Sequence, residues 1–411
     1  MKRTLSKGFW MMKLLNRDYG VVVRGVTAVL GFGLVLIMTG RPVLAREMAQ
    51  QCWTQGDFKV AARRAAWYVR QGWLGLDIAN DDFFDPTEGM NDAQLSALTG
   101  FVQARARKLP DVTVAGDMAV IAARKLNNNT DPTQRDANIA AFKAACDTLL
   151  AQPVDHTAKP ATADAPRVGD FPIENAKVTL ADFGRLFPND QMRWFVISGT
   201  FLGLIRENGF LAHDYDIDLG VFEDEIDIPK TIAAIRASDT FVLKKYDHHK
   251  STLLAPKTPA TNPDVPYILK LVHVSGIHID LFIHYHDTTT TPGNDWHGSS
   301  LHRWNNAAFD LVPYPFYDQT VLGPANADQY LSENYGDWRT PVTDFNCTTD
   351  TPNLALVAHP IAIVIFLKRY VLARGPDPAQ AAKLEAELLH NGFLIRQPDG
   401  SLAFSGALFA G

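Results

Sequence analysis

The sequence predicts an α/β (α+β) protein in which a mixed sheet with flanking helices follows a helical N-terminal domain. Between residues 46 and 152, apolar residues recur at three- and four-residue spacing, for example in 57–71 and 138–151, as is typical of amphipathic helices. From residue 168 to residue 350, short strand patterns are interleaved with helical ones, which predicts a mixed sheet. Residues 153–167 are rich in Pro, Ala, Thr and Asp, and we interpret them as the linker.

Six elements of the second domain can be placed from their patterns. We expect, in chain order, a strand at 194–197, a helix at 200–208, a strand at 215–222, a helix at 229–238 and strands at 267–274 and 277–285. Gly209 suits the end of the first helix, and Pro229 suits the first turn of the second. Ser275 and Gly276 predict a turn between the last two strands. Residues 351–411 predict a C-terminal helical extension, which we expect to close this domain.

The first 45 residues combine a basic leader with a hydrophobic segment at 25–40. A spanning helix needs about 20 apolar residues, so this segment is short for one. Three interpretations stay open: a signal peptide cleaved after Ala45, an uncleaved membrane anchor, and a buried or interfacial helix. The length of the basic leader favours a membrane anchor or a membrane contact, with the N-terminus on the cytoplasmic side.

Charge and cysteine spacing exclude several classes of protein. The formal net charge is −6, whereas proteins that bind duplex nucleic acid show a basic face, so we expect no nucleic-acid partner. A small anionic substrate in a local basic pocket is compatible with this charge. Cys52, Cys146 and Cys347 lie far apart and show no CxxC spacing, so we expect neither a thiolate zinc site nor a disulfide framework.

Three aspartates in the segment 213–220 are the most informative residues. Side chains two residues apart in a strand point to the same side. Asp214, Asp216 and Asp218 therefore share one face, spaced about 7 Å apart along the strand, while the apolar residues between them face a core. Clustered carboxylates repel one another unless a cation lies among them. The alternative interpretation is a solvated acidic strand at the edge of a sheet.

A further aspartate, Asp280, interrupts an otherwise apolar strand at 277–283. The isoleucines and leucine at alternate positions face one way, and Asp280 faces the other. An isolated carboxylate in a buried strand is costly unless it is paired or bound to a metal, although a solvent-facing position would remove that cost. Mg²⁺ and Mn²⁺ prefer such oxygen ligands and bridge phosphate oxygens.

An ordered set of short motifs around these aspartates resembles the LicD/fukutin family. The set comprises, in chain order, Ile197-Ser198-Gly199-Thr200, Gly203, Arg206, Gly209-Phe210, the segment 214–220, the strand 276–282, Tyr330-Leu331 and the closing motif 335–341. Each piece is weak alone, but the order of the whole set is specific. The resemblance covers about residues 193–341, and it leaves the helical N-terminal region and the tail uncovered.

The resemblance implies a nucleotidyltransferase-type fold and gives roles to individual residues. The turn Ser198-Gly199-Thr200 would lie against nucleotide phosphates. Asp216 and Asp218 would be paired ligands of Mg²⁺ or Mn²⁺, and Asp280 would be a third ligand or the base towards the acceptor. Asp214 would belong to the substrate site, although some members of the family lack an acid there.

Other side chains are weaker candidates for substrate binding. Arg206 is suited to clamp a phosphate, with a helix-surface arginine as the alternative. His213 is next to the acidic residues and suited to contact phosphate, with a structural role as the alternative. Trp296 and Trp304, in a segment that we interpret as a loop, are suited either to stack on a ligand or to pack in the core. Four lysines are more typical of surface positions: Lys244, Lys245, Lys250 and Lys270.

The function that the resemblance implies is transfer of a phospho-alcohol, such as ribitol phosphate or phosphocholine, from a CDP-linked donor to a glycan or glycolipid acceptor, with release of CMP. The reacting group is anionic, so one or two metal ions would neutralise the developing charge. Two alternatives stay open. One is a strict nucleotidyltransferase acting on a small molecule or protein, and the other is a non-catalytic, membrane-associated binding module.

The expected location of the enzyme depends on the source of the chain. A bacterial protein would be membrane-associated on the cytoplasmic face, because CDP-linked alcohols are cytoplasmic in bacteria. A eukaryotic protein would be lumenal with an N-terminal anchor. Only in that case would the glycosylation sequons at Asn128 and Asn346 be relevant.

Overall fold

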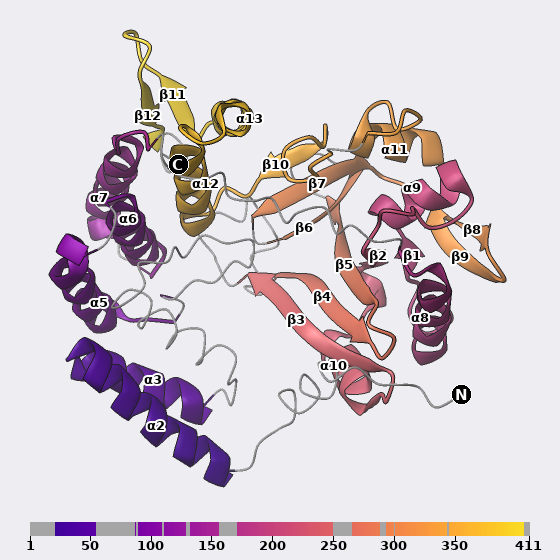
Figure 1. Ribbon diagram of the computed structural model, residues 1–411, viewed down its shortest axis with the longest axis horizontal. Helices are drawn as coiled ribbons and strands as arrows, with labels where there is room; N and C mark the ends of the chain where they lie inside the picture. The colour runs from indigo at the N-terminus through magenta and orange to yellow at the C-terminus, as the bar shows by residue number, and fades with distance from the viewer. Residues whose placement is uncertain are drawn as a thin grey trace. The chain divides into compact units, whose positions relative to one another are not determined.

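The chain forms two compact units (Figure 1). The computed structural model describes residues 21–54, 87, 89–108, 111–128, 132–155, 171–249, 265–287, 293–299, 301–342 and 345–406. The described part of the first unit, which we call the sheet unit, lies between residues 171 and 357. The second, which we call the helical unit, combines described residues before 156 with those after 357. The predicted α+β fold class is confirmed.

The sheet unit contains fifteen named elements in the described ranges, and their bounds in chain order are α8 (Ile173–Leu186), β1 (Phe195–Val196), α9 (Ser198–Glu207), β2 (Asp216–Phe222), η2 (Glu223–Glu225), α10 (Ile228–Ala237), β3 (Phe241–His249), β4 (Val265–His273), β5 (His278–Asp287), β6 (Asn294–Gly298), β7 (His302–Ala307), β8 (Leu311–Phe316), β9 (Gln319–Pro324), α11 (Ala327–Tyr335) and β10 (Leu354–Leu356). The six elements placed from the sequence are all present, with ends that differ by at most two residues.

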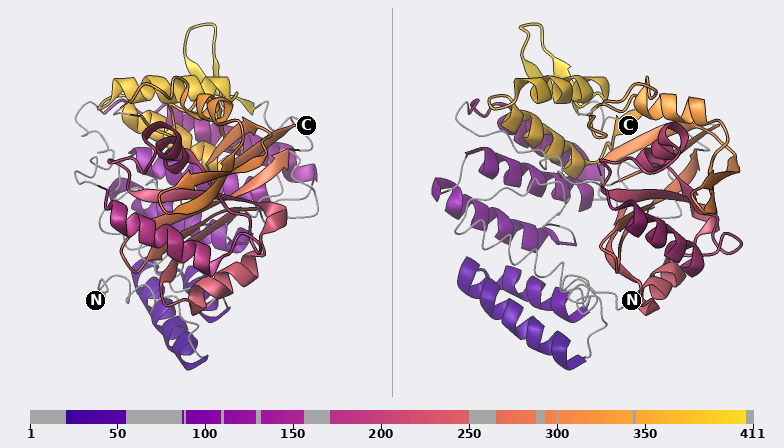
Figure 2. Two further views of the ribbon diagram at one scale, coloured as in Figure 1. Left: turned by 90° about the vertical axis from the view of Figure 1, so that its right-hand side faces the viewer. Right: turned by 45° about the vertical axis from the view of Figure 1, so that its right-hand side comes forward.

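The strands form one mixed sheet whose central strand is β5 (Figures 1 and 2). Within the described residues, the strand order is β10-β7-β6-β5-β2-β1-β9-β8, and β4 pairs with β5 and β3. One edge of β5 pairs in parallel with β2. Its other edge pairs antiparallel with β4 over its first half and with β6 over its last residues. The strand that carries Asp280 is therefore held on both edges.

The expectation of a loop at residues 294–306 is wrong. This segment forms β6 and β7, which pair antiparallel as a hairpin. Its aromatic side chains stack within the sheet: Trp296 lies on Tyr285 of β5 at 4.5 Å between ring centroids, and Trp304 lies on His297 at 5.3 Å. The polar residues between these aromatics obscure the strand pattern in the sequence.

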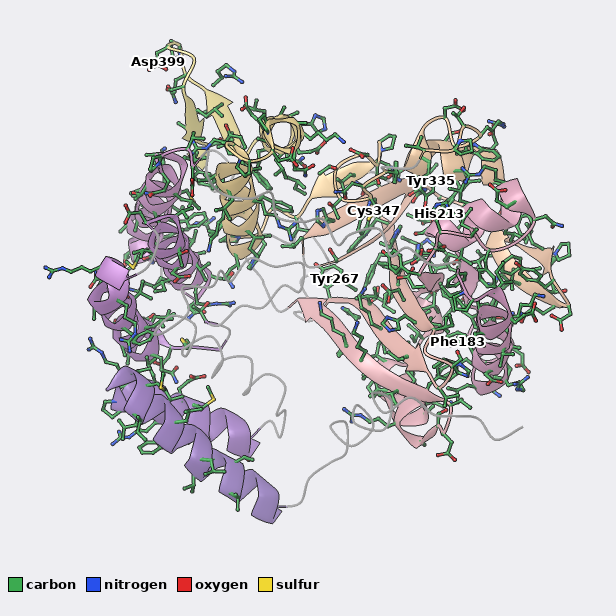
Figure 3. All side chains as sticks on the ribbon, viewed as in Figure 1. Phe183, His213, Tyr267, Tyr335, Cys347 and Asp399 are labelled. Carbon is green, nitrogen blue, oxygen red and sulfur yellow. The ribbon has the colours of Figure 1, made fainter. Side chains whose placement is uncertain are left out.

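A buried polar network fastens α8 to the turn between β4 and β5. The imidazole of His273 lies 2.9 Å from the Asp182 carboxylate through Nε2. Its Nδ1 lies 2.9 Å from the hydroxyl of Thr179 and 2.8 Å from that of Ser275. Phe183 of the same helix, labelled in Figure 3, packs edge-on against Trp194. Because buried polar groups are costly when unpaired, this network fixes one position of the helix over the sheet.

The helical unit is built from both ends of the described chain. Its elements are α2 (Val21–Thr39), α3 (Pro42–Thr54), α5 (Asp92–Arg105), η1 (Ala106–Lys108), α6 (Asp111–Asn128), α7 (Pro132–Leu150), α12 (Pro360–Ala373), α13 (Pro378–His390), β11 (Leu394–Arg396) and β12 (Leu402–Phe404). Consecutive helices from α2 to α7 pack on one another, including α3 and α5, between which most of the chain lies outside the described residues. None of the helices in the described ranges has both the length and the hydrophobicity that crossing a membrane requires.

The C-terminal helices pack with the N-terminal ones. We expected residues 351–411 to close the sheet domain, and β10 does join the edge of the sheet through β7. However, α12 packs against α6 and α7 (Figure 2). Arg374, just after α12, donates a hydrogen bond to the carbonyl of Leu150 at the end of α7, and Phe404 of β12 packs edge-on against Phe142 of α7. The apolar face of α12 packs against these helices. A sequence pattern shows that a helix has an apolar face, but it does not specify which element that face packs against.

Two buried histidines stack within the sheet, His284 of β5 and His297 of β6, with ring centroids 4.4 Å apart. Nε2 of His284 and Nδ1 of His297 are buried and have no hydrogen-bond partner among the described residues. Burial lowers the pKa of His297 to about 3. Burial, followed by the neighbouring His297, lowers the pKa of His284 well below its usual value. Both rings are therefore neutral at physiological pH.

We expect the free energy of unfolding to fall as the pH drops below about 6.5, the usual pKa of histidine in an unfolded chain. The folded-state pKa values are lowered, so the contribution of the two rings is fully present above that pH and is lost below it. For His297 alone, the loss between about pH 6.5 and pH 5 is on the order of 1.5 kcal/mol. Urea unfolding of the wild type and His297→Phe at both pH values measures it, because Phe keeps a stacked ring without a titrating group. Equal acid sensitivity of the two proteins would contradict the prediction.

Candidate functional site

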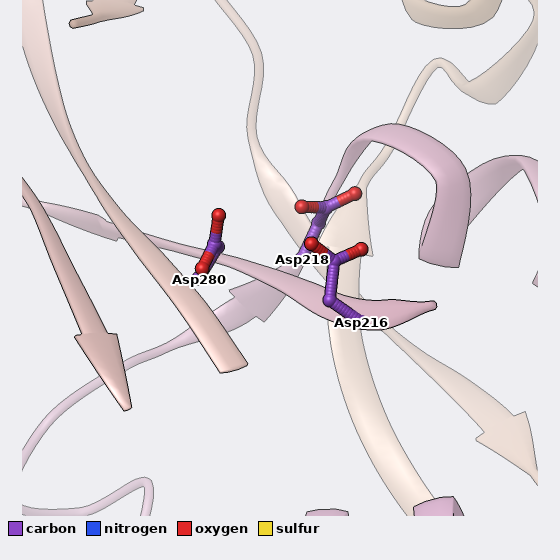
Figure 4. Close-up of side chains that lie close together, drawn as sticks. All are labelled: Asp216, Asp218 and Asp280. Carbon is purple, nitrogen blue, oxygen red and sulfur yellow. The ribbon is translucent and has the colours of Figure 1, made fainter. Parts of the chain in front are cut away.

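Three carboxylates converge on one face of the sheet (Figure 4). Asp216 and Asp218 lie on β2, and Asp280 lies on β5. The parallel register of these strands sets Asp218 opposite Asp280 and Asp216 opposite His278. One carboxylate oxygen from each aspartate lies within 4.8 Å of the other two, which is close enough for a single metal ion to contact all three.

The first turn of α9 is fastened to β2. The N–H of Gly199 donates a hydrogen bond to Oδ2 of Asp218 at 3.3 Å. The N–H of Asp218 donates in turn to the hydroxyl oxygen of Thr200 at 2.9 Å, and Thr200 is fully buried. These contacts orient the Asp218 carboxylate, a role for Gly199 and Thr200 that the sequence did not reveal.

Backbone strain and missing side-chain bulk mark this turn as specialised. Ser198 has φ of 47°, a left-handed conformation that is uncommon for a residue with a side chain. A Cβ added to Gly199 would lie 3.1 Å from Oδ2 of Asp214 and 3.7 Å from Oδ2 of Asp218. Glycine at this position therefore leaves the space beside the two carboxylates open.

Burial raises the pKa values of two carboxyl groups at this site. Burial first, and then the charges of Asp216, Asp214 and Asp280, raise the pKa of the Asp218 carboxyl well above its usual value. Burial also raises the pKa of Asp214. Oδ2 of Asp214 is buried and has no hydrogen-bond partner among the described residues. Clustered carboxylates with an unsatisfied oxygen fit a hard divalent cation such as Mg²⁺ or Mn²⁺.

A lysine lies within the cluster. Lys270 of β4 is the register partner of Asp280, and its Nζ forms an ion pair with Oδ2 of that aspartate. Desolvation lowers the pKa of the Lys270 ammonium, but the carboxylates of Asp280, Asp216 and Asp218 outweigh it, so the pKa is raised. The sequence presented Lys270 as an ordinary surface lysine, because only the pairing of β4 with β5 reveals its partner.

Two tyrosines and a cysteine surround the carboxylates, and Tyr335 and Cys347 are labelled in Figure 3. The charge of Asp216 is the main cause that raises the pKa of the Tyr215 hydroxyl. Burial, followed by the charge of Asp218, raises the pKa of the Tyr335 hydroxyl. The same two causes raise the pKa of the Cys347 thiol to about 11, so it is protonated at neutral pH although part of its surface is exposed. No motif or spacing around Cys347 indicated that it lies near these carboxylates.

The remaining predicted substrate-binding residues lie around this cluster in different ways. His213 is exposed, and its charge lowers the pKa of the adjacent Asp214, against the larger effect of burial. Arg206, at the end of α9, forms an ion pair with Glu207 and donates a hydrogen bond to the carbonyl of Trp338 at 3.1 Å. Arg206 thus connects α9 to the closing motif 335–341. Lys244 and Lys245 lie on β3, and Lys250 is outside the described residues.

Comparison with known proteins agrees with this geometry. Residues 191–326 match the family model described as LicD/FKTN/FKRP, nucleotidyltransferase domain, a range that includes all of the clustered aspartates but not the closing motif. The chain is also similar to ribitol-5-phosphate transferase FKTN of Mus musculus, with 23% identity over 189 residues, which cover 44% of this chain and 35% of the relative. The chain thus spans about a third of the length of the curated relative that it matches. Both comparisons therefore show similarity to the LicD/fukutin family, and the family model places it in the segment that carries the clustered aspartates, residues 191–326.

Proposed function

We propose that this protein transfers a phospho-alcohol from a CDP-linked donor to a hydroxyl group of a glycan or glycolipid acceptor and releases CMP, in a reaction that depends on Mg²⁺ or Mn²⁺. The observation that carries the proposal is the convergence of Asp216, Asp218 and Asp280 within a nucleotidyltransferase domain. The similar mouse protein is a ribitol-5-phosphate transferase, which supports ribitol phosphate as the group to test first.

Asp216, Asp218 and Asp280 would hold the metal. When bound, a divalent cation neutralises negative charge that develops on the reacting phosphate and aligns its oxygens. The protein keeps the ligands in place beforehand, since Gly199 and Thr200 bind Asp218 and the ligands stand on paired strands. Such preorganisation removes the cost of rearranging the site during the reaction.

Proton transfer accompanies the attack of the acceptor. The acceptor oxygen bonds to the phosphorus nearest the alcohol, the bond from that phosphorus to the CMP oxygen breaks, and the hydroxyl proton must leave. Lys270 binds Oδ2 of Asp280, which leaves Oδ1 for a metal or for the acceptor hydroxyl. We assign Asp280 as the base if Oδ1 is not used as a ligand.

We also propose that α2 contacts a membrane surface. Its side chains Val29, Leu30 and Ile37 are 72%, 66% and 83% exposed, and they follow the basic leader. An apolar helix face preceded by basic residues suits the interface of an anionic membrane. Which membrane face the enzyme occupies depends on the source of the chain.

Replacing two of the ligands tests the reaction class. We expect Asp216→Ala/Asp218→Ala to lower CMP release from a panel of CDP-linked alcohols by at least about 100-fold, on the scale of losing a transition-state contact. Removal of divalent metal by EDTA should have the same effect, and added Mn²⁺ should restore the wild type only. Asp190→Ala, which removes an exposed aspartate of the same unit, should retain activity.

Analysis of the products separates the alternatives. Acceptor carrying a nucleoside monophosphate, in place of free CMP, would identify a strict nucleotidyltransferase. A folded, metal-loaded wild type that processes no donor in the presence of glycan acceptors would support the non-catalytic alternative.

Filling the space beside the carboxylates should impair the reaction without unfolding the protein. We expect Gly199→Ala to lower transfer at least about tenfold, because its Cβ would lie 3.1 Å from Asp214 and crowd the site. Gly184→Ala is the matched control, since its Cβ would make only an ordinary contact at 3.4 Å with Trp194. Steady-state kinetics and thermal unfolding of both variants measure the difference. Full activity of Gly199→Ala would show that this space is not used.

A further inference from the structure

We propose that Lys270 couples metal binding to donor binding: its ammonium opposes occupation of the empty carboxylate cluster by a divalent cation and favours binding of the cation together with an anionic diphosphate. This inference rests on the proposed function. It concerns a positioning residue, because Lys270 acts through Asp280 and through its charge.

The position of Lys270 supports the inference. Its Nζ contacts Oδ2 of Asp280, and an oxygen of Asp280 lies within 4.8 Å of oxygens from Asp216 and Asp218. The place where a metal would bind therefore already has a cation beside it. The side chain of Lys270 is 34% exposed, so it is only partly buried in the sheet.

The balance of charge gives the direction of the effect. Three carboxylates attract a divalent cation strongly, and a neighbouring ammonium repels it across a few ångströms of partly buried protein. The same ammonium attracts the phosphates of a CDP-linked donor. It also offsets part of the negative charge of the three carboxylates, which would repel those phosphates. Removal of this one charge should therefore change the affinities for metal and for diphosphate in opposite directions.

A purely structural ion pair would behave differently. Leu269 and Leu271, on either side of Lys270 in β4, are fully buried and hold the strand in place. If Lys270 merely kept Asp280 in position, its loss would disorder a metal ligand and weaken the binding of metal and of diphosphate alike. The sign of the change in metal affinity distinguishes the two roles.

The experiment measures binding to the full chain by isothermal titration calorimetry, first with Mn²⁺ alone and then with CDP at saturating Mn²⁺. The main variant is Lys270→Gln, which can still donate a hydrogen bond to Asp280 but carries no charge. We expect it to bind Mn²⁺ alone at least about tenfold more tightly and CDP at least about tenfold more weakly than the wild type, as expected for one nearby charge. Lys270→Arg should resemble the wild type.

Controls make each outcome decisive. Lys230→Gln removes an exposed lysine from α10 of the same unit and should change neither affinity. Thermal unfolding checks that the variants fold, and Lys270→Met provides a second neutral variant whose affinities should shift as those of Lys270→Gln do. Mn²⁺ affinity that is unchanged or weakened in the neutral variants overturns the inference while leaving the proposed function intact. A wild type that binds no Mn²⁺ overturns both.

Discussion

The parallel pairing of β2 with β5 sets Asp218 opposite Asp280, where their carboxylates repel each other in the absence of a cation. The opposite face of the same strands supplies the compensation. Ile217, Leu219 and Ile279 have no exposed surface, and burying each such side chain stabilises the fold by about 1.5–3 kcal/mol. The apolar face therefore holds together a polar face that would not assemble alone.

Several contacts around the carboxylates offset part of the repulsion between them. Lys270 contributes a positive charge beside Asp280, and the Gly199 N–H contributes a hydrogen bond to Asp218. Neither is sufficient to satisfy the whole cluster, because Oδ2 of Asp214 still has no partner among the described residues. A site with rigid ligands and incomplete compensation suits the binding of a cation, which is the basis of the function that we propose.

Much of the sheet unit could be predicted from local patterns. The alternation of acidic and apolar residues predicted the strand that became β2, and the apolar run around Asp280 predicted β5. Contacts that depend on strand register could not be predicted, because the sequence does not specify which strand lies beside which. Lys270 is the clearest case. Its own strand pattern shows only that apolar residues flank it, and its contact with Asp280 follows from the pairing of β4 with β5. The hairpin of β6 and β7 was missed because its stacking residues, Trp296 and Trp304, are separated by polar ones.

The discontinuity of the helical unit has a consequence for the biogenesis of the chain. The helices α6 and α7 leave the ribosome before the sheet unit is made, whereas their packing partner α12 follows it. The surface of α6 and α7 that α12 covers therefore stays uncovered while some two hundred residues are translated. At ordinary elongation rates this takes on the order of ten to forty seconds. During that interval the nascent chain exposes an apolar surface, which makes the early helices a natural target for chaperones that act during translation.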